Sequence, residues 1–196
     1  MVEALAAENG KDAKVFSVVK GGRKLHEHSR LNDEYSQKIN SLASDHSFDI
    51  CFLQEMSLLP MTDYALFESG LKEVMSMVKS ASEFILYETW GRKEGSLKLS
   101  ELGVSSDEMY GRISAAYHRA AEYFGLRVSP VGENFYKVIS KECGIELYDD
   151  DKTHPSYKGS ALAALTHYVA IFGEIPASTE CLALTEEERK VFLSVI

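Results

Sequence analysis

The residues with the clearest potential for chemistry are Asp151 and His154, which lie in the stretch Asp149–Ser156. Asp151 precedes His154 by three residues, and the apolar segment Gly159–Phe172 follows them. A carboxylate at this spacing, on a loop that opens a helix, can orient an imidazole for general-base catalysis. The simpler interpretation is an acidic turn followed by a capped surface helix, because Asp-x-x-His is a short pattern.

A metal site formed by Asp149, Asp151 and His154 is another interpretation of this stretch, since carboxylate and imidazole groups bind metal ions. No second cluster of ligand residues supports it, and Asp149 and Asp150 are interpreted as solvated charges. The sequence therefore predicts no metal and no other cofactor.

The composition is that of a soluble globular protein. The chain has 196 residues, of which 45% are hydrophobic and 26% are charged. This length predicts a single domain, residues 1–196, with a core over about residues 1–173 and a C-terminal extension that carries a helix at about 185–195. The net charge of −9 disfavours nucleic acid and anionic membrane surfaces as partners, and leaves a small-molecule substrate as the expected one.

The spacing of the cysteines and the length of the apolar runs indicate in which cellular compartment the protein is expected. Cys51, Cys143 and Cys181 are widely separated and odd in number, so a disulfide framework is not expected. Residues 1–11 lack the basic and apolar regions of a signal peptide, and no apolar run is long enough to cross a membrane. The sequence predicts a cytoplasmic protein.

The elements that must position Asp151 and His154 alternate between strands and helices. The predicted strands are Lys14–Lys20, Asp49–Gln54, Glu83–Thr89 and Leu126–Ser129. The predicted helices cover residues 2–9, 31–42, 62–79 (capped by Thr62), 105–124, 135–140, 159–172 and 185–195, the last opened by a capping box from Thr185 to Glu188. Residues 23–30 and 90–103 are predicted as polar loops. This alternation predicts a three-layer α/β/α sandwich around a parallel sheet.

In such a sheet the ligand site lies at the carboxyl ends of the strands. The polar residues there are Gly21–Gly22 after the first predicted strand, Gln54–Ser57 after the second and Thr89–Arg92 after the third. The continuous apolar run Asp49–Gln54 is typical of a strand that is buried on both faces.

Three stretches of the chain resemble conserved blocks of the SGNH (GDSL-type) hydrolases, and they follow one another in the same order as in that family. Asp151-x-x-His154-Pro155-Ser156 resembles the last block. Leu53-Gln54-Glu55-Met56-Ser57 resembles the third block of the subgroup with Leu-Gln-Glu-x-Ser, and Val18–Gly22, followed by Leu25 and His28, resembles the second. The strand and loop Ile85–Trp90 match as well, and the resemblance covers about residues 1–173.

The resemblance implies a flavodoxin-like sandwich fold and serine-esterase chemistry. It makes His154 the general base, Asp151 the residue that orients the imidazole, and Gly22 (or Gly21) a backbone oxyanion donor. Gln54 stands where the family has an asparagine, and its amide can donate in the same way. His28 is expected near the site, and Trp90 is expected either to line the substrate cleft, together with Arg92, or to serve packing alone.

The departure from the family concerns the nucleophile. The family's first strand ends in Gly-Asp-Ser or Gly-Asn-Ser, and no such sequence occurs here. Ser17, Ser57 and Ser156 are poor replacements, because an exposed nucleophile normally sits at a tight turn that opens a helix. The fold is therefore expected to lack the family's first strand, which lies mid-sheet. Either Val15–Val19 then pairs directly with Asp49–Gln54, or a second copy of the chain completes the sheet as a homo-oligomer.

Two functions follow. The first is an ester hydrolase, on short-acyl or carbohydrate esters, that is truncated before its serine. The second is a non-catalytic remnant or binding domain that keeps the pocket. The expected location is the cytoplasm. If a strand precedes Met1 in the natural protein, secretion is an alternative.

Overall fold

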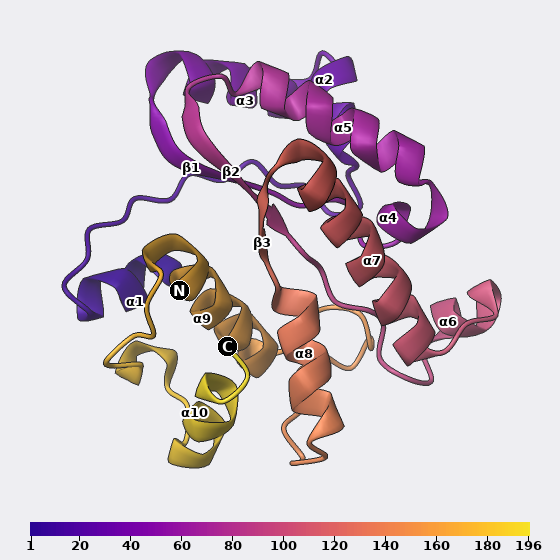
Figure 1. Cartoon of the computed structure of the whole chain (residues 1–196), viewed down its shortest axis with the longest axis vertical. Coiled ribbons are helices and arrows are strands. Elements are labelled where there is room, and N and C mark those ends of the chain that lie inside the picture. Colours follow the sequence, from indigo (N-terminus) through magenta and orange to yellow (C-terminus); the bar gives the residue numbers. More distant parts are fainter. The chain divides into compact units, whose positions relative to one another are not determined.

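The structure is a computed structural model that describes all residues from Met1 to Ile196 (Figure 1). The chain divides into two compact units, which are described separately below. The first unit comprises Met1–Val15, Trp90–Gly111 and Ser129–Ile196, and the second comprises Phe16–Thr89 and Arg112–Val128. The single domain expected from the length stays a prediction.

A three-stranded parallel sheet confirms the predicted mixed α/β class. Its strands are β1 (Phe48–Leu53), β2 (Ala81–Tyr87) and β3 (Arg127–Ser129), adjacent in that order. Phe48 lies opposite Ala81 and Leu53 lies opposite Leu86, so β1 and β2 end at the same edge. Three of the four predicted strands are thus confirmed, and ten α-helices accompany them. This composition is consistent with an α/β/α sandwich.

The helices of the second unit pack through apolar stripes. They are α2 (Leu25–Arg30), α3 (Glu34–Asp45), α4 (Leu59–Thr62), α5 (Tyr64–Met77) and most of α7 (Ser106–Phe124). On α5 the buried residues Phe67, Leu71 and Val74 recur at helical spacing, and the Phe67 ring lies 5.0 Å from that of Tyr117 on α7.

The predicted cap of the long helix at Thr62 is wrong. Asp63 caps α5 by accepting a hydrogen bond from the backbone N–H of Leu66. Thr62 instead ends α4, and its hydroxyl donates to the carbonyl of Leu58. Both residue types are good N-caps, but Thr62 still belongs to α4, so the cap falls on the next residue.

The first unit is built around α9 (Tyr157–Phe172), which α1 (Val2–Glu8) and α8 (Val131–Ser140) contact (Figure 1). Leu162, Leu165 and Tyr168 of α9 are fully buried, as expected for a helix that is apolar on most sides. The remaining elements are α6 (Leu97–Leu102), the 3₁₀ helix η1 (Glu180–Leu182) and α10 (Glu186–Leu193). The capping box from Thr185 to Glu188 is confirmed.

The predicted strand at Lys14–Lys20 is wrong, and so is its predicted pairing with Asp49–Gln54. Figure 1 shows the stretch between α1 and α2 as extended coil. Val19 is 74% exposed, and Ser17 is held through its carbonyl by Nζ of Lys38 rather than by a ladder. Strand propensity reflects a good fit to a half-buried pleated surface, which this segment does not find. Completion of the sheet by a second copy stays a prediction.

Burial of β1 also differs from the prediction. Only Leu53 is fully buried, and Ile50, Cys51 and Phe52 are half-buried. β1 is the edge strand of the sheet, so its apolar residues are covered less completely than those of a central strand.

Two short helices, α2 and α6, replace predicted loops. Leu25 and His28 form the buried side of α2, and Ser96 caps α6, which Gly103 ends at a φ of 65°. Helices of six residues contain too few apolar positions to show a clear period in the sequence. No helix of the chain is long and apolar enough to cross a membrane.

Candidate functional site

Asp151 and His154 form the hydrogen-bonded pair that their spacing predicted. Oδ2 of Asp151 lies 2.5 Å from Nδ1 of His154. Oδ1 of Asp151 accepts from the backbone N–H groups of Thr153 and His154, each at 2.9 Å. The bond from the His154 ring, supported by these two backbone bonds, lowers the pKa of Asp151 to about 2. The carboxylate is therefore ionised at neutral pH and can orient the imidazole.

The other ring nitrogen of His154 has no hydrogen-bond partner in the structure. The side chain of His154 is 73% exposed and that of Asp151 is 50% exposed. When a neutral imidazole donates its Nδ1–H to a carboxylate, the Nε2 lone pair is left free to accept a proton. This geometry would allow the ring to act as a general base toward a hydroxyl group.

Trp90 and its neighbours anchor the loop that carries the pair. The indole Nε1 of Trp90 donates to the carbonyl of Thr153 at 2.9 Å, and the indole ring stacks on Phe135 at 4.6 Å and 9°. The backbone N–H of Lys93 donates to the carbonyl of Lys152, and Nζ of Lys152 donates to the carbonyl of Gly95. The loop is thus tied to residues 90–95 at three points, which limits movement of the imidazole.

Ser156 begins α9 and is fully engaged in doing so. Its hydroxyl donates to the carbonyl of Glu146 and accepts from the N–H of Gly159, and its N–H donates to the carbonyl of Leu147. A bridge between Tyr148 and Pro155 closes the same loop. Ser156 is therefore an N-cap, and its hydroxyl does not point a free proton toward His154.

Arg92 places a positive charge beside the pair. Its side chain is half-buried, and burial lowers the pKa of its guanidinium while the charges of Asp151 and Tyr148 oppose that shift. A cation here favours a negatively charged group, either Asp151 itself or part of a bound ligand.

The remaining predicted site residues, Gly22, His28 and Gln54, belong to the second unit. Gly22 is exposed and has a φ of +71°, a conformation that favours glycine. Gln54 directly follows β1 and is exposed, so its side chain is accessible to a ligand. His28 is buried in α2, its Nδ1 has no hydrogen-bond partner, and burial together with the charge of Arg23 lowers its pKa. Their functional roles stay predictions.

Sequence reasoning did not single out Glu55 and Tyr117. Glu55 is only 1% exposed, and the Tyr117 hydroxyl accepts from its backbone N–H at 3.2 Å. The signal was present, because Glu55 is an acidic residue that directly follows an apolar strand and Gln54. Burial raises the pKa of Glu55, and groups with perturbed pKa values cluster at functional sites.

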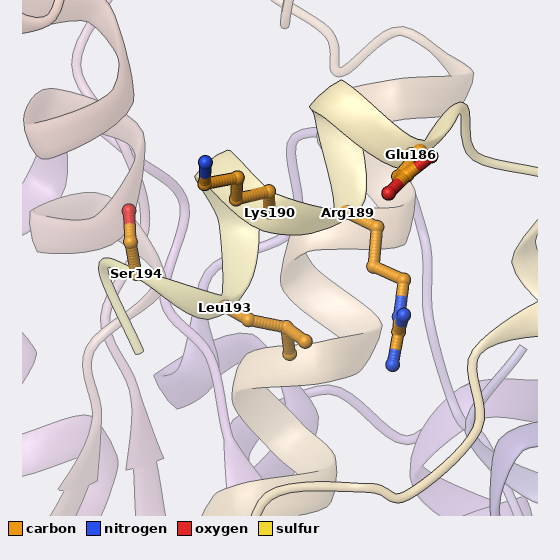
Figure 2. Close-up of a pocket in the computed structure, with 5 residues that line it drawn as sticks. All are labelled: Glu186, Arg189, Lys190, Leu193 and Ser194. Atoms are coloured by element: carbon orange, nitrogen blue, oxygen red, sulfur yellow. The ribbon is translucent and has the colours of Figure 1, made fainter.

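No group of three or more His, Cys, Asp or Glu side chains is arranged to hold a metal ion. Asp151 also has both carboxylate oxygens occupied by protein donors. The hollow shown in Figure 2 is separate from the pair: its lining comes from α10 and the residue after it, and includes Arg189 and Leu193.

Two solved structures resemble this chain over most or all of its length. One is a protein from Slackia heliotrinireducens that is described as a candidate SGNH hydrolase, with a TM-score of 0.71 at 27% sequence identity, over 87% of this chain and 90% of that one. The chain has an SGNH-hydrolase-like fold. The other is a DUF4886 family protein from Bacteroides uniformis, with a TM-score of 0.79 at 16% identity, over 100% of this chain and 86% of that one. This second likeness concerns the fold alone.

The SGNH-like fold agrees with the order of the resembling stretches in the sequence, the last of which contains Asp151 and His154. Searches against family models and against curated proteins gave no match. The activity must therefore be argued from the site itself.

Proposed function

We propose that residues 1–196 carry the base half of an SGNH-type ester-hydrolysing site. His154 is the general base and Asp151 holds its imidazole. The observation that carries the proposal is the Asp151–His154 pair, with its 2.5 Å bond, its ionised carboxylate and its unpartnered Nε2. The SGNH-like fold supports it, because the pair lies in the stretch that resembles the last block of the SGNH hydrolases.

In the proposed reaction, Nε2 of His154 takes the proton of a hydroxyl group whose oxygen attacks the ester carbonyl. The resulting imidazolium is stabilised by Asp151 and returns the proton to the leaving alcohol oxygen. Gly22 N–H and the Gln54 amide, both in the second unit, stay the oxyanion donors that the resemblance implies. We propose short-acyl or carbohydrate esters as the substrates, with Arg92 and Trp90 near the leaving group.

The hydroxyl group is not assigned to a serine among residues 1–196. Ser156 is used as a helix cap, and no serine of the first unit is hydrogen-bonded to His154. Ser17 lies in exposed coil with its carbonyl held by Lys38. This observation favours a second candidate function, a ligand-binding domain that retains the pair without turnover.

An activated ester distinguishes the two functions, because an oriented imidazole can activate water on such a substrate. We expect the 196-residue chain to hydrolyse p-nitrophenyl acetate above the buffer rate, and we expect His154→Ala to lower that excess by about 100-fold, the lower end for general-base catalysis. Initial rates of the two proteins at neutral pH provide the measurement.

His118→Ala is the matched control, since His118 is also an exposed histidine near a carboxylate, with Nε2 3.7 Å from Glu88. It should leave the rate unchanged. Equal rates for the parent chain and His154→Ala would support the binding domain. Labelling by a fluorophosphonate on a serine, lost in His154→Ala, would show that the nucleophile is among these residues after all.

A further inference from the structure

The carboxylate of Glu55 is buried at the carboxyl end of β1 and connects two parts of the second unit. It accepts from the backbone N–H of Leu25 at 3.1 and 3.2 Å, one distance to each oxygen. Oε1 also accepts from the N–H of Met56 at 2.7 Å. Leu25 begins α2, so Glu55 fastens the start of this helix to the end of the strand.

The segment that Glu55 fastens carries the Gly21–Gly22 turn. The N–H of Arg23 donates to the carbonyl of Lys20 at 3.1 Å, which closes the turn around the two glycines. Only two residues separate Gly22 from Leu25, and Gln54 directly precedes Glu55. Glu55 therefore connects the chain just after Gly22 to the chain just after Gln54.

Few groups around Glu55 compensate for its burial. Lys24, the N-cap of α2, and Glu27 within α2 act on its charge in opposite directions, and the Tyr117 hydroxyl of α7 accepts from the Glu55 backbone N–H. Burial raises the pKa of Glu55 to about 7, although the hydrogen bonds from Met56 and Leu25 oppose the shift. A buried carboxyl group with this pKa changes charge within the range that NMR can follow.

We propose that Glu55 is a positioning residue that fixes the Gly21–Gly22 turn relative to Gln54 by holding the N–H of Leu25. The inference rests on the proposed function, since the turn and Gln54 matter together only if both donate to an oxyanion. Donors of this kind contribute to catalysis only when they are held in place before the reaction begins.

The wild-type chain gives the first test, by ¹⁵N–¹H NMR between pH 5 and pH 9. The amide signals of Leu25 and Met56 should titrate together with a midpoint near pH 7. The Gly22 signal should follow the same midpoint, because a neutral carboxyl group accepts the Leu25 N–H more weakly than a carboxylate does and so loosens the anchor of the turn. Glu55→Gln should stop the titration and keep the turn, since one side-chain oxygen remains as an acceptor. Glu55→Met, of similar size, should reduce hydrogen-exchange protection of the Leu25 amide by about tenfold.

Glu73→Met is the matched control. Glu73 also fastens α2, but at its other end, through Ser29 and Arg30. The Glu73→Met substitution should leave the Gly22 signal and its titration unchanged. A Gly22 signal that does not respond between pH 5 and pH 9 would overturn the inference even if Glu55→Met does not fold, and so would a response that persists in Glu55→Gln.

The two proposals fail separately. A titrating Gly22 signal in a chain without His154-dependent ester hydrolysis would leave the positioning role in place and remove the proposed function. Hydrolysis that depends on His154, together with a silent Gly22 signal, would remove the positioning role alone.

Discussion

Gly159→Ala is expected to lower the free energy of unfolding by about 3 kcal/mol, the upper end for an overpacked site. A Cβ at this position would lie 2.2 Å from the carbonyl oxygen of Leu147, 2.9 Å from the Phe135 ring and 3.1 Å from Cβ of Pro155. The Leu147 oxygen is backbone and accepts from the N–H of Ser156, so it cannot move without breaking the start of α9. Urea unfolding followed by circular dichroism measures the change.

The same substitution should disturb the candidate site, because the residues it displaces adjoin the His154 loop. Gly111→Ala is the control: Gly111 is exposed on α7, and a Cβ there meets no atom within 4 Å. Removing a helical glycine should stabilise the protein by about 0.5–1 kcal/mol. Equal stabilities of Gly159→Ala and the parent chain would show that the close packing described here is absent.

Arg23→Ala is expected to cost about 3 kcal/mol, the lower end for breaking a buried ion pair. The Arg23 side chain is only 3% exposed, and its guanidinium donates to both carboxylate oxygens of Asp33, at 2.6 and 3.0 Å. It also donates to the carbonyl of Glu27. Since Asp33 is itself 34% exposed, water can replace part of the hydrogen bonding that its carboxylate loses when Arg23 is removed. The expected loss of stability is therefore at the lower end of the range.

Acidification should weaken the same pair. Arg23 holds the pKa of Asp33 well below its ordinary value of 3.8. A lowered pKa in the folded state means that the stabilisation is complete above about pH 4 and is lost as the pH falls below it. The difference in stability between the parent chain and Arg23→Ala should therefore shrink in acid.

Arg30→Ala serves as the control for Arg23→Ala. Arg30 is 50% exposed and pairs with Glu73 on the surface of the same unit, so its removal should cost much less than the removal of Arg23. A cost for Arg23→Ala no larger than for Arg30→Ala would contradict the burial of the Arg23–Asp33 pair.

The sequence predicted the elements with strong periodic patterns. β1, β2, α5, α7 and α9 have continuous apolar runs or clear stripes, and each lies within a few residues of its expected place. The sequence-based prediction failed where the composition of a segment does not match the surroundings that the segment has in the fold. Lys14–Lys20 has the composition of a strand but finds no partner edge, and α2 is held by side chains such as Arg23 and Glu55 that no periodicity reveals.

The candidate site divides in the same way. The Asp151–His154 bond follows from local spacing, because a loop of three residues brings the two side chains together. The contacts that anchor this loop cannot be predicted from local spacing, because Trp90 and Thr153 are 63 residues apart and only the tertiary structure brings them together. Glu55 was missed for a related reason, because its importance comes from a contact with Leu25, 30 residues earlier.

The tautomer of His154 tests the central claim most directly. If Asp151 orients the ring as a general base, ¹⁵N NMR of the neutral imidazole should show the proton on Nδ1 and the lone pair on Nε2. Asp151→Asn should shift this balance toward the Nε2–H form. A neutral ring in the parent chain that already carries its proton on Nε2 would contradict the account, because such a nitrogen cannot accept the proton of an attacking hydroxyl group.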